Sequence, residues 1–366
     1  MTASITEDKI DRIIGKVCEI LLNVTPEDVT ILSHPDHDGL TATVLFNTYF
    51  IKHYGTECKK VLRPTKEMPY YVIFHKLLRE KPKILLILDA LVGKHKDSIR
   101  KLVEEGTVVI NMDHHDIVNI EHSNYINVNP HVWGIEYLNT SSLAWQVLRK
   151  IDEDYFDERS WLAGIGSVQD YCYRDNTSLF KTMYELGLSN ISSYEDIFDS
   201  ELMKCAKMIN AACRDVGYEY VYSKTLNASI SDSFKTLLKD DKMLNSYSRY
   251  MKELTTIYDR FRKTSHEYSE MNLIAYRHNE RARTSLIAEI CEMDRRPLIY
   301  FGYYEGMLGF SSLFFDYDVR KLARLFNGGG PHPKIAGGKT KKSFNEIIDS
   351  ISEYLHPKQR LLRDFY

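Results

Sequence analysis

Short apolar runs alternate with amphipathic segments along the first third of the chain. Apolar runs of about four to eight residues are typical of buried strands, whereas apolar positions spaced by three and four residues predict helices. The pattern predicts a helix over 4–23, strands over 29–33, 58–62, 84–88 and 107–112, and helices over 40–54, 70–79 and 94–105. This order predicts an α/β fold with a doubly wound, mostly parallel sheet.

The pattern becomes helical after residue 130 and returns to mixed strands and helices near residue 270. Helices are predicted over 140–151 and 160–171, and small residues such as Gly164 and Gly166 would let the second helix lie close to a neighbour. The last part of the chain predicts strands over 272–276, 297–304 and 307–312, and helices over 284–291, 318–326 and 343–355. We therefore predict an α/β domain over 1–189, a helical connector over 190–268 and a smaller α/β domain over 269–366.

Composition excludes several classes of protein. The 366 residues are 43% hydrophobic and 27% charged, and no apolar run approaches the ~20 residues of a membrane span. The N-terminal segment mixes both charges, unlike a signal or transit peptide. The six cysteines are scattered without a CxxC pair, which predicts reduced thiols in a soluble, cytoplasmic protein.

Charge is unevenly distributed along the chain. The net charge of −3 argues against a generic polyanion binder. From residue 320 onward, however, ten Lys and Arg residues stand against four Asp and Glu residues. A basic C-terminal domain beside an acidic site would suit a phosphate-bearing substrate, although a solvated basic helix explains the charge equally well.

Residues that can bind metal ions follow the first predicted strand. His34, Asp36 and Asp38 occupy alternate positions, so an extended chain would present all three on one side. Gly39 permits a sharp turn, and the helix that follows would direct its amino end toward the same place. Carboxylates and imidazole together suit Mn²⁺ or Mg²⁺. An acidic turn that only caps the helix is the alternative.

Two more strands end in the same way. Asp89 follows the run ILLIL, and Asp113-His114-His115 follows the strand 107–112. A helix cap is the simpler interpretation of Asp89. Adjacent histidines after a buried strand instead favour a site in which one histidine binds a metal ion and the other contacts substrate, while Asp113 orients one of the imidazole rings. Asp170 lies near the end of the helix 160–171.

Together these segments hold enough ligands for two cations. Two close cations activate a bridging hydroxide and stabilise in-line displacement at phosphorus. The chain has no GxSxG or P-loop motif, which argues against acyl transfer and ATPase chemistry.

Five ordered motifs resemble those of the DHH phosphoesterase family. They are SHPDHDGLTA, LILDA, NMDHHD and GSVQDY, and far downstream GGGPHPKIAGG, which is similar to the signature of the DHH-associated C-terminal domain. The resemblance implies catalytic roles for Asp89, Asp113, His114 and His115. It assigns one Mn²⁺ or Mg²⁺ ion to His34, Asp36 and Asp89, and a second ion to Asp38, Asp89, His114 and Asp170, with His115 facing the scissile phosphate.

The resemblance also implies where substrate binds. The loop 328–338 would offer backbone amides and side chains to a phosphate or end nucleotide, from Gly329, Gly330, His332 and Lys334. The segment MINAACRDVG resembles a connector stretch of RecJ-type exonucleases, in which Arg214 would contact the nucleic-acid backbone. A phosphate-binding Ser-x-Arg of many relatives is replaced near Ser312, so Arg320 or Arg283 would have to substitute for that arginine.

The branch of the family is suggested by His34, where bacterial RecJ usually has Asp. A His there resembles archaeal RecJ-like proteins, some of which associate with the replication factor GINS. We therefore expect an exonuclease that hydrolyses single-stranded DNA or RNA to nucleoside monophosphates, with a role in replication or repair. The alternatives are a phosphodiesterase for dinucleotides or short oligonucleotides, of the nano-RNase or pAp-phosphatase type, and a replisome scaffold with weak nuclease activity.

Overall fold

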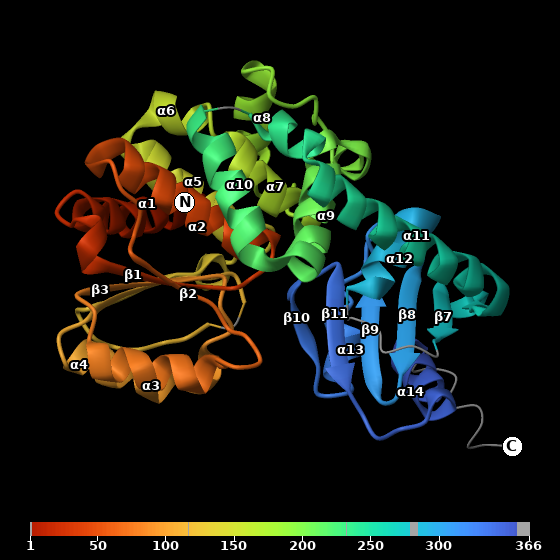
Figure 1. The fold of residues 1–366 in the computed structure, drawn as a ribbon. Coiled ribbons are helices and arrows are strands. Elements are labelled where there is room, and N and C mark those ends of the chain that lie inside the picture. The colour runs from red at the N-terminus through yellow and green to blue at the C-terminus, as the bar shows by residue number, and fades with distance from the viewer. Residues whose placement is uncertain (1, 116, 232, 279–284, 357–366) are drawn as a thin grey trace, which may run out of the picture. The chain divides into compact units, whose positions relative to one another are not determined.

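The computed structural model describes residues 2–115, 117–231, 233–278 and 285–356. The chain divides into two units, Met1–Ser248 and Arg249–Tyr366, and each unit has its own sheet (Figure 1). The segment 190–268, for which we predicted a separate connector, is shared between the two units.

The first unit is built on a five-stranded sheet in which every pairing is parallel. Its strand order is β2-β1-β3-β4-β5, from the segments β1 (Val29–Ser33), β2 (Lys60–Leu62), β3 (Ile84–Leu88), β4 (Val108–Met112) and β5 (Tyr125–Val128). The predicted α/β class is confirmed, but the short β5 was not predicted. In this order the direction of winding reverses between β1 and β3, and ligands of doubly wound sheets bind at that point, beyond the carboxyl ends of the strands.

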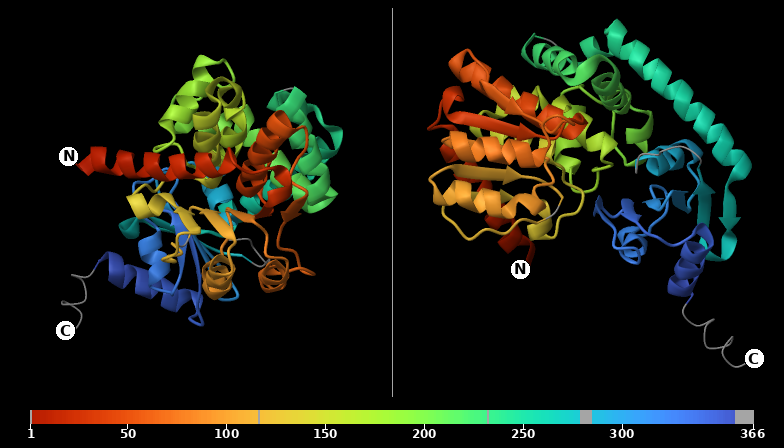
Figure 2. Two further views of the ribbon diagram at one scale, coloured as in Figure 1. Left: turned by 90° about the vertical axis from the view of Figure 1, so that its left-hand side faces the viewer. Right: turned by 60° about the horizontal axis from the view of Figure 1, so that its bottom comes forward.

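Helices cover both faces of this sheet (Figures 1 and 2). One face carries α3 (Tyr70–Glu80) and α4 (Lys96–Glu104), whose apolar residues share a core with β3 and β4. The other carries α1 (Thr2–Leu21), α2 (His37–Tyr54), α5 (Thr140–Ile151) and α7 (Ser160–Gln169), of which α2, α5 and α7 pack against one another. The remaining helices of this unit are α6 (Glu153–Asp157), α8 (Thr177–Glu185), α9 (Glu201–Ala212) and α10 (Tyr218–Ser231).

Short helical turns join these elements. They are η1 (Pro26–Asp28), η2 (Gly93–His95), η3 (Pro130–Trp133), η4 (Glu195–Asp199), the π-helical η5 (Cys213–Gly217) and η6 (Phe234–Lys239). The π-turn η5 lies between α9 and α10, and single π-turns inside helices are frequent at functional sites.

The second unit holds a mixed sheet of six strands in the order β10-β11-β9-β8-β7-β6, in which β7 and β8 pair in parallel and the other neighbours pair antiparallel. The strands are β6 (His266–Tyr268), β7 (Leu273–Arg277), β8 (Ile299–Tyr304), β9 (Met307–Ser311), β10 (Gly329–His332) and β11 (Ile335–Lys339). Its other elements are α11 (Asp241–Thr264), which begins in the first unit, η7 (Ser269–Met271), α12 (Leu286–Asp294), α13 (Arg320–Arg324) and α14 (Phe344–Leu355). The predicted pair of strands 297–304 and 307–312 is confirmed as the antiparallel hairpin β8–β9.

The expectation of a loop over 328–338 is wrong, because most of this segment forms the hairpin β10–β11. Glycine makes this possible. A Cβ atom on Gly330 would lie 2.3 Å from the carbonyl oxygen of Ile335, and one on Gly328 would lie 2.2 Å from that of Gly337. The two strands therefore approach more closely than side chains would allow.

None of the helices within the described residues is both long and apolar enough to cross a membrane.

Candidate metal centre

The predicted ligands of the first unit meet at the carboxyl edge of its sheet. The structure places His34 and Asp36 after β1, Asp89 after β3, and Asp113, His114 and His115 after β4. Asp170 is the C-terminal cap of α7, and Asp38 lies in the first turn of α2. Two of the strands involved, β1 and β3, are those between which the sheet reverses its winding.

One group of ligand atoms consists of His34, Asp36 and Asp89. The Nδ1 atom of His34 lies 2.7 Å from Asp36 Oδ2 and 3.8 Å from Asp89 Oδ2. Asp36 also caps α2, because its Oδ1 accepts a hydrogen bond of 3.2 Å from the backbone N–H of Gly39. The capping interpretation and the ligand interpretation of this turn are therefore compatible.

The cap also corrects one expectation. Because α2 begins at His37, the chain from His34 to Asp38 is not extended throughout, and Asp38 points from a helical turn instead. Gly39 is required here, since a Cβ atom on it would lie 2.3 Å from the carbonyl oxygen of His34.

A second group consists of Asp89, His114 and His115. Asp89 Oδ1 lies 3.1 Å from His114 Nε2 and 3.5 Å from His115 Nδ1. Asp89 has a φ of +56°, a conformation that Asp adopts more readily than most residues, and its backbone N–H bonds to the carbonyl oxygen of Met112. The backbone at the end of β3 therefore holds Asp89 in a defined conformation. The simpler interpretation of Asp89 as a helix cap is wrong, because Val92 caps the next helical turn.

The carboxylates of this site have no lysine or arginine partner among the described residues to balance their negative charge. Asp89 is only 2% exposed, and burial together with the nearby carboxylates, above all Asp36 and Asp38, raises its pKa well above the ordinary value. Within the part of the chain that the structure describes, the ion pairs of Asp36, Asp38, Asp89 and Asp170 are all with histidines. Buried carboxylates without a Lys or Arg partner favour a bound cation.

The two histidines of the DHH sequence have different environments. Burial and the neighbouring His115 lower the pKa of His114 to about 4, so its imidazole is neutral and suited to bind a metal ion. Burial alone would lower the pKa of His115, but the hydrogen bond and charge of Asp113 raise it to about 9. Asp113 Oδ1 lies 2.8 Å from His115 Nδ1 and also accepts the backbone N–H of His114. Asp113 is thus positioned to orient a ring, as the sequence suggested.

Asp38 is fixed by the amino end of α5. Its Oδ1 accepts hydrogen bonds from Asn139 Nδ2 at 2.6 Å and from the backbone N–H of Ser141 at 2.9 Å, and its Oδ2 accepts the N–H of Thr140 at 2.9 Å. Oδ2 also lies 3.8 Å from His114 Nε2. The helix end therefore holds Asp38 beside the second group of ligands.

Asp170 presents one oxygen to the same region. Its Oδ1 lies 3.2 Å from His37 Nε2, and its Oδ2 lies 4.0 Å from His114 Nε2. Oδ2 is buried and makes no hydrogen bond with any residue that the structure describes. A buried carboxylate oxygen that faces an imidazole nitrogen at this distance is suited to bind a cation together with it.

The charges of two arginines, Arg63 and Arg214, affect the pKa of the buried Cys213 thiol. Burial raises the pKa of the Cys213 thiol to about 12; the charge of Asp36 contributes to the rise, and those of Arg63 and Arg214 oppose it. Arg63 follows β2, stacks on the ring of Tyr218 at 4.7 Å and pairs with Glu219. We did not predict a role for Arg63, because its position at the carboxyl end of β2 becomes apparent only in the folded structure.

Of the two arginines that we expected to replace the arginine of the Ser-x-Arg motif, Arg320 is engaged within its own unit. Arg320 forms a two-pronged ion pair with Asp318, whose side chain accepts from both Nε and Nη2. Arg283 lies outside the described residues.

The predicted substrate-binding residues of the second unit lie in the β10–β11 hairpin. Gly329 and Gly330 belong to the edge strand β10, and His332 is buried at its end. Lys334 Nζ donates to the carbonyl oxygen of Phe315 at 2.8 Å and lies 3.7 Å from Asp316. Lys334 therefore has a structural role within its own unit, and its contact with substrate stays a prediction.

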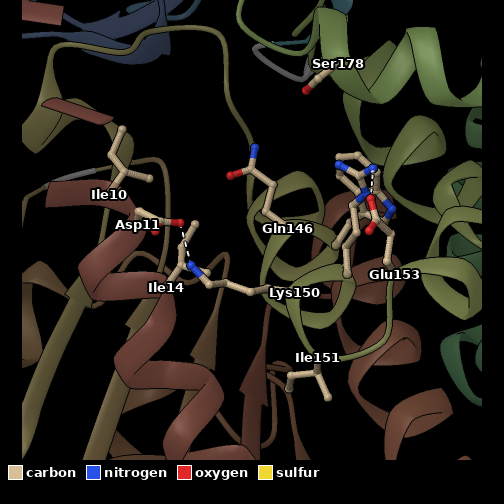
Figure 3. Close-up of a pocket in the computed structure, with 10 residues that line it drawn as sticks. Ile10, Asp11, Ile14, Gln146, Lys150, Ile151, Glu153 and Ser178 are labelled. Carbon is tan, nitrogen blue, oxygen red and sulfur yellow. Dashed lines mark hydrogen bonds and ion pairs between the residues drawn. The ribbon is translucent and has the colours of Figure 1, made fainter. Parts of the chain in front are cut away.

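A hollow beside α1 and α5 lies apart from these residues (Figure 3). Its wall includes Ile10 and Ile14 of α1, and the ion pair of Asp11 with Lys150 crosses it. None of the predicted site residues lines it, so we assign it no part in the chemistry.

Comparison with known proteins shows which proteins this chain resembles. Residues 28–164 match the model of the DHH family, N-terminal domain. No curated protein matches the chain by sequence.

Solved structures share the fold. RecJ from Thermus thermophilus, solved in complex with Mn²⁺, superposes with a TM-score of 0.63 at 17% identity over 94% of this chain. This chain spans only 55% of that protein's length. The DHH domain of a protein described as a member of a family of ribosomal proteins gives 0.67 at 14% identity, with 97% of this chain and 92% of that chain covered. A pGpG-specific phosphodiesterase from Vibrio cholerae gives 0.50 at 11%, with 90% and 99% covered.

Residues 28–164 therefore match the DHH family, as the motifs predicted, and the fold of the chain resembles that of RecJ. At these identities the solved structures establish the fold alone.

Proposed function

We propose that this chain is a phosphodiesterase that uses two Mn²⁺ or Mg²⁺ ions to remove nucleotides from an end of single-stranded DNA or RNA. The proposal depends chiefly on Asp89, whose two oxygens lie toward different groups of ligands. Oδ2 lies toward His34, and Oδ1 toward His114 and His115. A carboxylate in that position can bridge two ions.

The donor set supports hard cations, because carboxylate oxygens and imidazole nitrogens suit Mn²⁺ or Mg²⁺. His34 Nδ1 lies 2.7 Å from Asp36 Oδ2, and His114 Nε2 lies 3.1 Å from Asp89 Oδ1, so each pair would be able to hold one cation. Bound cations would lower the pKa of a water molecule and stabilise charge on the attacking and leaving oxygens at phosphorus.

The protein's own side chains would position the substrate. Asp113 holds His115 through Nδ1, so His115 Nε2 can donate a hydrogen bond to a phosphate oxygen when the ring is protonated, and its raised pKa favours that state at neutral pH. Arg63 and Arg214 would bind phosphates further along the strand, since guanidinium groups recognise phosphate oxygens with two parallel hydrogen bonds. Gly329, Gly330 and His332 would bind the end nucleotide from the second unit.

The test is a time course with Mn²⁺ on DNA and RNA strands of about twenty nucleotides, labelled at either end, beside a labelled dinucleotide. A ladder of products from the long strand supports the exonuclease, and the label gives its direction. Cleavage of the dinucleotide alone would replace it with a short-substrate phosphodiesterase. His114→Ala should abolish turnover, whereas His75→Ala, which changes an exposed histidine on α3, should not.

Absence of cleavage on every substrate by a protein that binds Mn²⁺ would refute the proposal and favour the scaffold alternative. Association with GINS stays a prediction from the resemblance, and a pull-down with the wild type and His114→Ala would test it, because a scaffold does not need the metal ligands.

A further inference from the structure

His37 lies between two of the predicted ligands, yet the sequence pattern gave it no role. Its side chain is buried in the first turn of α2, with 5% of the residue exposed. The Nε2 atom lies 3.2 Å from Asp170 Oδ1, and the Nδ1 atom lies 3.1 Å from the Nδ2 atom of Asn210 in α9. The backbone N–H of His37 donates to Asn210 Oδ1 at 3.1 Å.

These contacts define where the proton of the ring lies. A backbone N–H can only donate, so the oxygen of the Asn210 side chain must face it and the amide nitrogen must face Nδ1. The amide nitrogen is a donor, so a neutral His37 accepts at Nδ1 and carries its proton on Nε2. That proton points to Asp170.

Charge does not alter this direction. A protonated ring also carries a proton on Nε2, so in both states His37 donates to Asp170 Oδ1.

The hydrogen bond has a consequence for the second oxygen of Asp170. With Oδ1 occupied by His37, the carboxylate can turn only a little, and Oδ2 remains directed toward His114 Nε2 at 4.0 Å. Oδ2 is the buried oxygen that has no hydrogen bond within the described residues. Ligands held in this way bind metal more strongly, because their orientation is fixed before the ion arrives.

We propose that His37, oriented by Asn210, is a positioning residue that holds Asp170 ready to bind a cation together with His114. This inference rests on the proposed function, because it assumes the metal site. It adds a link from the site to α9 and the π-turn, where the Nε atom of Arg214 donates to the backbone oxygen of Asn210 at 3.1 Å. One segment would thus support both a metal ligand and a phosphate-binding arginine.

The test measures Mn²⁺ binding without substrate, by calorimetry and by the electron paramagnetic resonance of free Mn²⁺. The wild type should bind two ions per chain. His37→Ala should weaken one of them by about 10- to 100-fold, which is the usual effect of removing a residue that orients a ligand. His37→Gln should retain most of the affinity, because the glutamine amide can replace Nε2–H as the donor to Asp170.

A second measurement does not depend on either variant folding. In the Mg²⁺-loaded wild type, nitrogen NMR of the His37 ring should show a protonated Nε2. A separate comparison uses variants: Asn210→Ala should weaken binding of the same ion by a smaller factor than His37→Ala.

Each outcome decides between the hypotheses. Unchanged binding in His37→Ala, or a ring protonated only on Nδ1, would overturn the role of His37 while leaving the metal site intact. Loss of one ion in both His37→Ala and His37→Gln would instead make the imidazole a direct ligand and also overturn it. A wild type that binds no Mn²⁺ would refute the proposed function together with this inference.

Discussion

Gly166→Ala is expected to disable the site from a position that touches no metal. Gly166 lies in α7, and a Cβ atom there would be 2.0 Å from Ser141 Oγ, 2.6 Å from Asp38 Oδ1 and 2.9 Å from Asn139 Nδ2. Ser141 can rotate its hydroxyl away. Asp38 cannot move as easily, because hydrogen bonds from the amino end of α5 hold both of its oxygens.

The size of the effect follows from these distances. Asp38 Oδ1 would have to retreat by roughly 1 Å to reach the 3.5 Å at which such atoms normally pack. Overpacking of this kind costs about 1–3 kcal/mol, and hydrogen bonds to a charged group contribute about 1.5–3 kcal/mol each. Alanine would recover about 1 kcal/mol through its higher helix propensity. We therefore expect the free energy of unfolding of the first unit to fall by about 2–4 kcal/mol.

The effect on activity should be larger than the effect on stability. A displacement of about 1 Å in a catalytic group can lower turnover by about 100-fold. Gly164→Ala is the matched control, because it adds the same methyl group to the same helix away from Asp38. Its Cβ would meet Met183 Sδ at 2.7 Å and Leu202 Cδ1 at 3.2 Å, and a methionine side chain can adapt.

The assay is urea unfolding followed by tryptophan fluorescence, with Mn²⁺ titration and oligonucleotide turnover on the same samples. All three tryptophans, Trp133, Trp145 and Trp161, lie in the first unit, so the signal reports on that unit alone. If Gly166→Ala keeps the Mn²⁺ affinity and turnover of Gly164→Ala, the close approach of α7 to Asp38 has no functional meaning and the reasoning fails.

Three further predictions concern charge. Asp89→Asn should remove Mn²⁺-dependent stabilisation, which for the wild type is about 2.7 kcal/mol at a hundredfold excess over Kd. The metal-free protein should be at least as stable, because burial and the nearby carboxylates disfavour the charged form of Asp89. Thermal unfolding with and without Mn²⁺ measures both effects, and a preserved Mn²⁺ effect contradicts the bridging role. Arg63→Ala and Arg214→Ala should each weaken binding to single-stranded DNA or RNA and reduce the slope of log K against log salt by about 0.7. Arg100→Ala, which changes an exposed residue of α4, should reproduce the wild-type slope. Equal slopes in all four proteins would show that Arg63 and Arg214 do not bind the phosphates of the substrate. Lys334→Ala should lower the stability of the second unit by about 1 kcal/mol through the lost bond to Phe315, and an increase in KM without loss of stability would show that it binds phosphate instead.

Much of the candidate site was predictable because its signals are local. A strand buried on both faces must be a short, almost entirely apolar run, and Ile84–Leu88 and Val108–Met112 are such runs. The parallel arrangement brings their carboxyl ends to one edge, so residues that directly follow them meet without further information. This explains why Asp89, His114 and His34 converge as the sequence suggested.

Errors in the fold arose where local signals are weak. The strand Tyr125–Val128 is short and flanked by polar residues, and the glycine-rich hairpin β10–β11 contains few of the β-branched residues that usually indicate strands. Pairing with an existing sheet stabilises such segments. The helix α2 begins at His37, earlier than the predicted start at residue 40, because Asp36 caps it and the first turn already includes Asp38 and Gly39.

The sequence by itself determined the α/β class, the principal strands and the chemical types of the candidate metal ligands, because each depends on neighbouring residues in the chain. Only the tertiary structure decided which residues support those ligands. His37 and Asn210 are 173 positions apart, and Asp38 and Ser141 are 103 apart. Hydrogen bonds of this kind depend on how helices α2, α5, α7 and α9 pack over the sheet, and that packing leaves no periodic pattern in the sequence.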